Sequence, residues 1–330
     1  MANLRAGLIG LGMMGRHHAR VLSNLEGVDL VGMADVAGDP HDVTGGRPLV
    51  KSIEELIAMK LDYCVVALPT IYHEQAGLAL AEAGVHTLIE KPVTHDTASA
   101  RRVTDAFASR GLIGAVGHIE RYNPALQSAR ARIEGGDLGT VYQVTTRRQG
   151  PFPARIADVG VVKDLATHDI DLTVWVTQQP YVAVGARTAF RSGREYEDLI
   201  AATGQLADGT VTNHLVNWLS PMKERVTIIT GELGTFVADT LTADLTFYAN
   251  GSVKVTRSDI AQFRGVSEGD VVRFAIAKPE PLGVEHQNFR DAVLGKESDI
   301  VTMEQGLATL AVAEAMIQSA NTGVTVTLGG

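Results

Sequence analysis

The 330-residue sequence lacks the features that mark several classes of protein. Its one cysteine, Cys64, excludes an intrachain disulfide and a metal site built from cysteines. No apolar run reaches the roughly 18 residues of a membrane-spanning helix, and no basic flank with a cleavage site precedes the first strand, so we expect a cytoplasmic protein without a membrane partner. Basic residues are also few, 29 Lys and Arg against 38 Asp and Glu, and the net charge of -9 argues against nucleic acid as a partner.

What the sequence does contain is a globular composition, 45% hydrophobic and 20% charged, in a chain long enough for two domains. Apolar runs alternate with helical patterns up to about residue 117, and this βαβ series predicts a doubly wound parallel sheet, the Rossmann fold. We expect strands at 4–9, 28–34, 62–67, 86–89 and 112–117, and helices at 15–25, 52–59, 73–84 and 96–110.

Beyond about residue 120 the pattern changes to β-branched and alternating runs between glycine turns, which predicts an α+β domain with a largely antiparallel sheet. The turns Asp208-Gly209 and Asn250-Gly251 are strong hairpin signals. The predicted division is 1–120 for dinucleotide binding and 121–330 for substrate binding and oligomerisation. The expected strands lie at 141–148, 181–190, 197–206, 210–218, 223–230, 234–239, 244–248 and 252–256, and the helices at 124–134, 284–294 and 303–321.

A glycine-rich turn follows the first strand, in the sequence Gly10-Leu11-Gly12-Met13-Met14-Gly15. Gly10 permits a tight turn, Gly12 lets the backbone approach a pyrophosphate, and Gly15 lets the next helix pack closely. The second strand ends in Asp35, 20 residues past Gly15, where an acid that binds a ribose diol is expected. A carboxylate there repels a 2′-phosphate, so the sequence favours NAD over NADP, although Asp35 could instead be a turn residue.

Glu90-Lys91-Pro92 follows the strand expected at 86–89. Ligands of open parallel sheets lie beyond the carboxyl ends of the strands, which predicts one crevice bordered by Gly10, Asp35, Pro69, Lys91 and Gly117. Proline keeps Lys91 out of helical geometry, and its peptide bond can be cis. Lys91 is therefore a candidate for substrate contact, with an ordinary surface lysine as the alternative.

A second cluster of polar residues surrounds His168. Helical spacing would place Asp164, His168 and Asp171 on one face. Histidine is suited to accept a proton near neutral pH, and a neighbouring carboxylate would orient it. The alternatives are a structural histidine or a metal ligand, although hydride transfer needs no metal and no H-E-x-x-H pattern is present.

Together these motifs make the chain resemble the Gfo/Idh/MocA family, named after glucose-fructose oxidoreductase and inositol dehydrogenase. The resemblance spans nearly the whole chain. It implies a Rossmann domain, an open-faced antiparallel sheet that joins copies into a homodimer or homotetramer, and reversible oxidation of a sugar or cyclitol hydroxyl with NAD. The motifs that carry it are 10–19, 69–73, Glu90-Lys91-Pro92, Arg121-Tyr122-Asn123-Pro124, and Asp164 with His168.

The resemblance also implies roles for individual residues. The family's catalytic trio falls on Lys91, Asp164 and His168, and no metal site is expected. Arg121, Tyr122 and Asn123 follow the last Rossmann strand, where either substrate contact or simple packing is possible. The implied cofactor contacts are Gly10, Gly12, Met13, Met14, Gly15, Asp35, Leu68, Pro69, Thr70, His73, Glu90 and Lys91, and the implied substrate contacts are Lys91, Arg121, Tyr122, Asn123, Arg155, Asp164 and His168.

The substrate stays open at this point. The stretch from Arg147 to Arg155 looks like the family branch that oxidises the 3-hydroxyl of UDP-N-acetylhexosamines, and Arg147, Arg148 and Arg155 could pair with a diphosphate. Adjacent residues of a strand point to opposite faces, however, so at most one of Arg147 and Arg148 would serve such a site. The alternatives are an inositol, free-sugar or diol dehydrogenase and a non-catalytic NAD-binding regulator.

Overall fold

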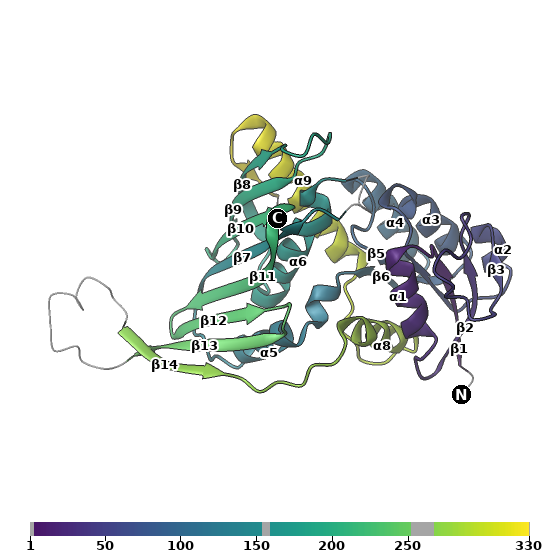
Figure 1. Cartoon of the computed structure of the whole chain (residues 1–330), viewed down its shortest axis with the longest axis horizontal. Helices are drawn as coiled ribbons and strands as arrows, with labels where there is room; N and C mark the ends of the chain where they lie inside the picture. The colour runs from purple at the N-terminus through teal and green to yellow at the C-terminus, as the bar shows by residue number, and fades with distance from the viewer. Residues whose placement is uncertain (1–2, 154–158, 252–266, 330) are drawn as a thin grey trace. The chain divides into compact units, whose positions relative to one another are not determined.

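The computed structural model describes residues 3–153, 159–251 and 267–329. The chain forms two compact units (Figure 1). Unit 1 consists of Met1–Ile119 with Glu280–Glu314, and unit 2 consists of Glu120–Pro279 with Ala315–Gly330. The sequence placed everything after residue 120 in the second domain, whereas residues 280–314 pack with unit 1. Hydrophobic periodicity identifies an amphipathic helix without showing which sheet it covers.

Unit 1 is built on a six-stranded parallel sheet with the strand order β3-β2-β1-β4-β5-β6. This order, reversed on either side of β1, is that of a doubly wound Rossmann fold, as predicted. The strands are β1 (Leu4–Ile9), β2 (Val28–Ala34), β3 (Leu49–Val50), β4 (Tyr63–Val66), β5 (His86–Glu90) and β6 (Gly114–Gly117). The helical elements are α1 (Met13–Leu22), α2 (Ile53–Ile57), η1 (Thr70–Tyr72), α3 (His73–Glu82), α4 (Thr97–Ala108), α8 (Pro281–Val293) and the start of α9 (Met303–Thr322).

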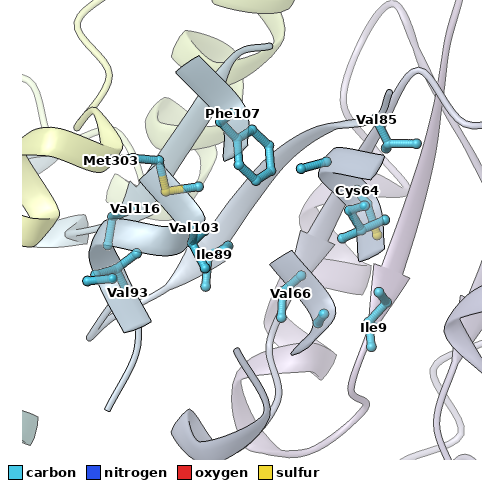
Figure 2. Packing of buried hydrophobic residues seen from close by; sticks show 14 of the residues in the cluster. Ile9, Cys64, Val66, Val85, Ile89, Val93, Val103, Phe107, Val116 and Met303 are labelled. Carbon is cyan, nitrogen blue, oxygen red and sulfur yellow. The ribbon is translucent and has the colours of Figure 1, made fainter. Parts of the chain in front are cut away.

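Apolar side chains cover both faces of this sheet. Figure 2 shows one of the two layers, in which Cys64 and Ile89 of the sheet lie with Phe107 of α4 and Met303 of α9. The other layer includes Leu8, and Phe289 of α8 meets the ring of Tyr63 edge-on at 5.4 Å. Because both faces are buried, most of the strands are largely apolar runs, which is why the sequence located five of the six described strands within two residues. The two-residue strand β3 is too short to give such a run and was not predicted.

Unit 2 contains a nine-stranded sheet with the order β14-β13-β12-β11-β7-β10-β9-β8-β15. Only β7 and β10 pair in parallel among these described strands, so the sheet is largely antiparallel, as predicted. The strands are β7 (Val141–Pro151), β8 (Tyr181–Ala189), β9 (Leu199–Leu206), β10 (Val211–Asn217), β11 (Leu219–Gly231), β12 (Gly234–Asp239), β13 (Asp244–Gly251), β14 (Ser267–Arg273) and β15 (Val326–Thr327).

Two helices pack on one face of this sheet, α5 (Pro124–Glu134) and α6 (Thr167–Thr177). Leu126 and Ala129 of α5 and Leu172 and Trp175 of α6 share a core with strand residues such as Phe236. The short helix η2 (Ile119–Tyr122) precedes α5, and the π-helical turn η3 (Val162–Ala166) runs directly into α6. Side chains on the other face of the sheet include the exposed Val211, Tyr248 and Val271.

One of the two predicted hairpins is confirmed and the other is wrong. Gly209 has a φ of +91° in the turn between β9 and β10, where Asp208 Oδ1 accepts from the Thr210 amide at 2.9 Å. Asn250 and Gly251 instead belong to β13, where Asn250 pairs with Glu268 and Gly251 pairs with Ser267. These two residues therefore do not form the tight turn of a two-residue hairpin. The Asn250 side chain donates to the Glu232 carbonyl at 2.7 Å, a tertiary contact that the turn signal could not reveal. The strand expected at 252–256 lies outside the described residues.

Candidate active site

The glycine turn after β1 is as tight as the sequence requires. Gly10 has a φ of +90°, and a Cβ there would come 2.6 Å from the Ala67 carbonyl oxygen. A Cβ on Gly15 would lie 1.9 Å from the Gly10 carbonyl oxygen, so α1 can approach the turn only with glycine at that position. Gly12 has open space, with nothing within 4 Å of an added Cβ. The turn therefore presents bare backbone at the one glycine through which a ligand would approach.

Helix α1 begins at this turn without a side-chain cap. Its N-cap residue is Gly12, no side chain bonds its first amides, and its first turn holds no acidic residue. The first amides of a helix lack intrahelical acceptors and carry a partial positive charge, so they suit an anion such as a phosphate. Of the two methionines among the predicted contacts in this turn, Met13 is exposed and Met14 is half-buried.

Asp35 lies at the end of β2, half-buried, and its carboxylate contacts the glycine turn. Oδ2 accepts from the Leu11 amide at 2.6 Å, and Oδ1 accepts from the Ala37 amide at 2.7 Å. The next residue, Val36, is 83% exposed and uncharged, so it offers nothing to a 2′-phosphate. The open glycine, the uncapped helix and this carboxylate fit the diphosphate and ribose of NAD.

The loop after β4 contains four further predicted cofactor contacts. Pro69 is exposed, Leu68 is half-buried and Thr70 is buried. His73 is 1% exposed and lies 2.9 Å from two carbonyl oxygens, that of Pro92 through Nδ1 and that of Leu68 through Nε2. The histidine thus joins the loop after β4 to the loop after β5. In this arrangement its contribution to a cofactor site is to hold these two loops together.

Lys91 is half-buried directly beyond β5, and its peptide bond to Pro92 is cis. The Lys91 backbone amide donates to Glu90 Oε2 at 3.1 Å. The other carboxylate oxygen, Oε1, lies 2.9 Å from Nε2 of the buried His18. Burial would raise the pKa of Glu90, but the hydrogen bond from His18, the charge of Lys91 and the hydrogen bond from the Lys91 amide help to outweigh it and lower that pKa. Glu90 is therefore an anion next to Lys91.

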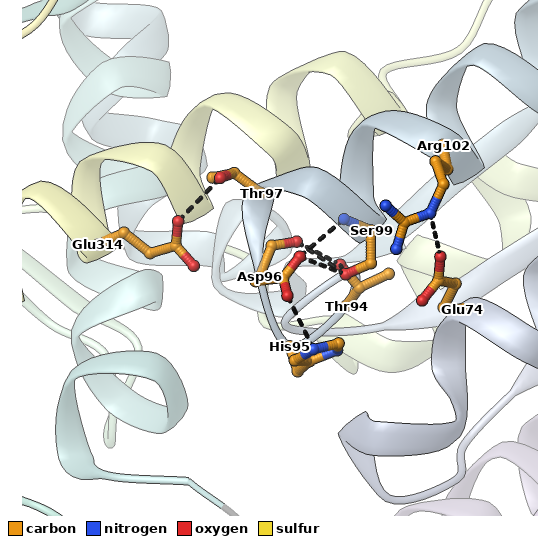
Figure 3. A network of polar contacts seen from close by, with 8 residues as sticks. All are labelled: Glu74, Thr94, His95, Asp96, Thr97, Ser99, Arg102 and Glu314. Atoms are coloured by element: carbon orange, nitrogen blue, oxygen red, sulfur yellow. Dashed lines mark hydrogen bonds and ion pairs between the residues drawn. The ribbon is translucent and has the colours of Figure 1, made fainter.

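A polar network fixes the chain between Lys91 and α4 (Figure 3). Asp96 caps α4, and its Oδ1 accepts from the Ser99 amide at 2.7 Å and the Ser99 hydroxyl at 2.8 Å. Thr94 donates to the Asp96 carbonyl at 2.8 Å, and Thr97 donates to Glu314 of α9 at 2.9 Å. The segment between Lys91 and α4 is therefore held by hydrogen bonds at the start of α4 and by a contact between α4 and α9.

In unit 2, Asp164 and His168 lie on either side of the junction between η3 and α6. Their residues are 4% and 8% exposed. The sequence predicted a regular helical face, whereas Asp164 belongs to a π turn. Such turns are rare and frequent at functional sites, and they shift the angular position of the side chains that precede them.

Glu197 holds the start of this π turn and was missed by the sequence. Its Oε1 accepts from the Val162 amide at 3.1 Å, and a Cβ on Gly160 would come 2.0 Å from that oxygen. Burial raises the pKa of Glu197. No spacing or motif links Glu197 to residues more than 30 positions earlier, so only the fold reveals the contact.

Two buried arginines fix α6 from other elements. Arg121 of η2 binds Asp171 with two hydrogen bonds, of 2.8 and 2.6 Å. Arg148 of β7 binds Asp169 at 2.9 Å and Glu120 at 2.8 Å. Both guanidinium groups are nearly fully buried. These ion pairs place Asp169 and Asp171, the acidic neighbours of His168, in positioning roles.

The predicted arginine cluster divides between the two faces of the sheet, as the strand alternation indicated. Arg148 is engaged with carboxylates on the helix-covered face, while the exposed Arg147 pairs with Glu224 at 3.0 Å. Arg155 lies outside the described residues. The diphosphate interpretation therefore gains no support from Arg148.

Tyr122 and Asn123 are both buried in unit 2. Asn123 caps α5, since its Oδ1 accepts from the Ala125 amide at 3.0 Å, and its Nδ2 donates to the Thr240 carbonyl at 3.0 Å.

The predicted residues therefore fall into two groups, one in each unit. Unit 1 holds the predicted cofactor residues and Lys91 at the carboxyl edge of its sheet. Unit 2 gathers Asp164, His168 and the residues that hold them.

The described part of the chain lacks the features of a membrane span and of a clustered metal site. No helix there is long and apolar enough to cross a bilayer. In the same ranges, no group of three or more His, Cys, Asp or Glu side chains is arranged to hold a metal ion. The absence of a metal cofactor stays a prediction of the sequence.

Two protein-family models match the chain. One, described as an oxidoreductase family with an NAD-binding Rossmann fold, matches residues 4–118. The other, described as the C-terminal alpha/beta domain of the same oxidoreductase family, matches residues 130–328. The first match confirms the predicted fold and NAD as the cofactor.

Curated relatives include a UDP-N-acetylglucosamine 3-dehydrogenase of Acidithiobacillus ferrooxidans, 33% identical over 219 residues that cover 64% of this chain and 66% of the relative. A scyllo-inositol 2-dehydrogenase (NAD(+)) of Bacillus subtilis is 28% identical over 179 residues, 51% of this chain and 52% of the relative. The matched segments span less than two thirds of these relatives.

Two solved structures resemble the chain over nearly its full length. That of the Acidithiobacillus ferrooxidans dehydrogenase has a TM-score of 0.82 at 27% identity and covers 98% of this chain and 99% of that one. A structure of GenD2 from gentamicin A biosynthesis, in complex with NAD, has a TM-score of 0.82 at 25% identity and covers 100% and 97%.

Proposed function

Because the chain belongs to the Gfo/Idh/MocA oxidoreductase family, we propose that it is an NAD-dependent dehydrogenase that oxidises a secondary hydroxyl of a sugar or sugar nucleotide. The observation that carries the proposal is the retention of Lys91, Asp164 and His168 alongside an NAD-type glycine turn. A non-catalytic NAD-binding regulator would have no need of these three side chains.

In this proposal the cofactor is held by the backbone of the glycine turn and by Asp35. The amides at the start of α1 bind the diphosphate, and the Asp35 carboxylate accepts hydrogen bonds from the adenosine ribose. Bound NAD supplies the hydride acceptor. Replacing Asp35, for example by Asp35→Ser, should lower the affinity of the protein for NAD and reduce its preference for NAD over NADP. Fluorescence titration with both nucleotides would measure the two affinities.

The chemistry itself is assigned to three side chains. His168 would accept the proton of the substrate hydroxyl, and bound NAD would be the acceptor for the hydride from the carbon that carries this hydroxyl, so that a carbonyl product remains. Lys91 donates a hydrogen bond to the reacting oxygen, whose negative charge grows in the transition state. Asp164 orients His168.

We propose the 3-hydroxyl of a UDP-N-acetylhexosamine as the preferred substrate position. One support is that the 33% identical relative is named a UDP-N-acetylglucosamine 3-dehydrogenase. The other is that the sequence between Arg147 and His168 resembles the family branch that acts on UDP-N-acetylhexosamines. Arg148 is already neutralised, so a UDP diphosphate would need Arg155 or another partner. An inositol is the second candidate, because several relatives at 26 to 29% identity are inositol dehydrogenases.

The deciding experiment measures NADH formation at saturating NAD with UDP-N-acetylglucosamine, inositols, glucose and other polyols, with NADP in parallel. We expect the highest kcat/KM with the UDP sugar. Activity on inositol alone would reject the nucleotide-sugar assignment. Tight NADH binding with no turnover on any hydroxyl substrate would favour the regulator instead.

We further propose that unit 2 joins copies of the chain into a homodimer or homotetramer in the cytoplasm. The sheet face opposite α5 and α6 carries Val211, Tyr248 and Val271, which are 47, 48 and 59% exposed. Apolar side chains of this kind on a sheet face commonly mark an interface. Light scattering of the purified protein would give the mass of the assembly.

A further inference from the structure

A chain of buried titratable side chains lies behind Lys91 in unit 1 and has no part in the chemistry described above. Glu90 of β5, His18 of α1 and His286 of α8 are 8, 0 and 1% exposed. Glu285, the neighbour of His286, is also 1% exposed. Four such groups in one apolar domain are costly unless their hydrogen bonds are well matched.

Three of these groups are linked in series. Glu90 Oε1 lies 2.9 Å from Nε2 of His18, and Nδ1 of His18 lies 2.8 Å from Nε2 of His286. The two imidazole rings meet edge-on, with their centroids 5.1 Å apart and their planes at 75°. The chain thus connects α8 to the residue that precedes Lys91.

The position of each proton in this series of side chains can be deduced from one group that can only donate. The Lys91 backbone amide always donates, so Glu90 Oε2 always accepts. With Glu90 ionised, Oε1 also accepts, and His18 must carry its proton on Nε2. The bond between His18 and His286 then has two possible forms, in which either His286 donates from Nε2 to Nδ1 of His18, or a His18 that carries both protons donates from Nδ1 to His286. The first form places one proton on each ring and is the order that the experiment below tests.

The electrostatics of the pocket agree with this order. The pKa of Glu90 is lowered, as described above, whereas burial holds the pKa of His286 well below its usual value. Burial, with a smaller contribution from the Glu90 charge, raises the pKa of Glu285 well above its usual value. The pocket therefore favours the anionic form of Glu90 and the neutral forms of Glu285 and His286.

We propose that His18 and His286 are positioning residues that lock the Glu90 carboxylate in one orientation and thereby fix the backbone at Lys91 for catalysis. The consequence for catalysis rests on the proposed function, whereas the proton order does not. Gly117 of β6 leaves room for the Glu90 carboxylate in this orientation, since a Cβ at position 117 would come 3.3 Å from Glu90 Oε2.

The replacement Glu90→Gln tests the proton order without changing the shape of the side chain. The Lys91 amide requires the glutamine oxygen on its side, so the glutamine NH2 faces His18 and donates to it. His18 must then move its proton from Nε2 to Nδ1, and His286 must do the same. Nitrogen-15 NMR of the histidine side chains distinguishes these tautomers, with the two signals assigned from His18→Asn and His286→Asn.

The matched control is Glu285→Gln, the same chemical change in the same pocket. Burial favours the neutral form of Glu285, and neither of its oxygens has a hydrogen-bond partner, so both histidines should keep the Nε2-H tautomer. Unchanged tautomers in Glu90→Gln, or a switch in the control as well, would overturn the proposed proton order.

Kinetics then test the consequence for Lys91. We expect Glu90→Gln and His18→Asn to lower kcat about tenfold to a hundredfold. His18→Asn alters no implied cofactor contact, so its KM and NAD affinity should stay within about twofold of wild type. Glu285→Gln should keep wild-type kcat. If the tautomers switch while kcat is unchanged, the positioning of Lys91 is refuted. If the wild type turns over no hydroxyl substrate, the proposed function fails and the NMR result still decides the proton order.

Discussion

The two units hold their predicted functional residues in opposite ways. In unit 1, backbone geometry dominates, because Gly10 and Gly15 permit contacts that no side chain could share, and the start of α1 is left bare. In unit 2, buried ion pairs dominate, with Arg121 and Arg148 holding α6 beside His168. A backbone site tolerates changes at its open positions and fails at its closed ones. A site held by buried charges depends on every partner remaining in place.

The largest effects are expected from the catalytic side chains that we propose, Lys91 in unit 1 and His168 in unit 2. We expect Lys91→Met and His168→Asn each to lower kcat by about a thousandfold or more, because each removes a charge or proton acceptor from the reacting oxygen. NAD affinity should stay within a few-fold, since the glycine turn and Asp35 are unchanged. Stopped-flow hydride transfer and NADH fluorescence titration give the two quantities. Near-normal turnover in both variants would refute the catalytic assignment.

The dependence of unit 2 on buried charge can be tested at Arg121. Arg121→Met leaves the Asp171 carboxylate buried without its bidentate partner, which should lower the free energy of unfolding by about 3–5 kcal/mol. Denaturant unfolding followed by circular dichroism measures the loss. The double variant Arg121→Met with Asp171→Leu removes both charges and should recover most of it. Equal losses in the single and double variants would show that packing, not the ion pair, holds α6.

The contrast between closed and open backbone positions can be sharpened with two alanines. Gly15→Ala brings a Cβ against the Gly10 carbonyl, and we expect a loss of about 2–4 kcal/mol in unfolding free energy. Gly12→Ala meets open space and should change stability by less than about 0.5 kcal/mol. Under the proposed binding mode the cofactor approaches the chain at Gly12, so NAD affinity should still fall about tenfold in that variant. Calorimetry separates the two effects, and equal destabilisation by both alanines would contradict the distinction.

This contrast also explains how far the sequence could predict the molecule. The glycine spacing and Asp35 lie within one βαβ stretch, so their geometry is local and legible. The contacts of His18 with His286 and of Arg121 with Asp171 join residues 268 and 50 positions apart, and no pattern along the chain marks them. The π turn at Asp164 depends on backbone packing against Glu197. Sequence reasoning therefore found the residues proposed for chemistry and missed those that hold them.

The smallest expected effect concerns Glu285, the one buried acid among the described residues of unit 1 whose carboxylate has no hydrogen-bond partner. Its pKa is raised in the folded protein, so folded Glu285 keeps a proton that the unfolded chain loses above about pH 4.5. From that pH up to the folded-state pKa, the unfolded state binds fewer protons, and wild-type stability falls as pH rises, by at most about 1.4 kcal/mol per pH unit. Glu285→Gln removes this loss, so the variant should gain on wild type between pH 5 and pH 7 in urea unfolding. At pH 4 the two proteins should differ little. A constant difference across this range would mean that Glu285 is ionised in the fold, and Glu90 would then no longer be the lone anion beside Lys91.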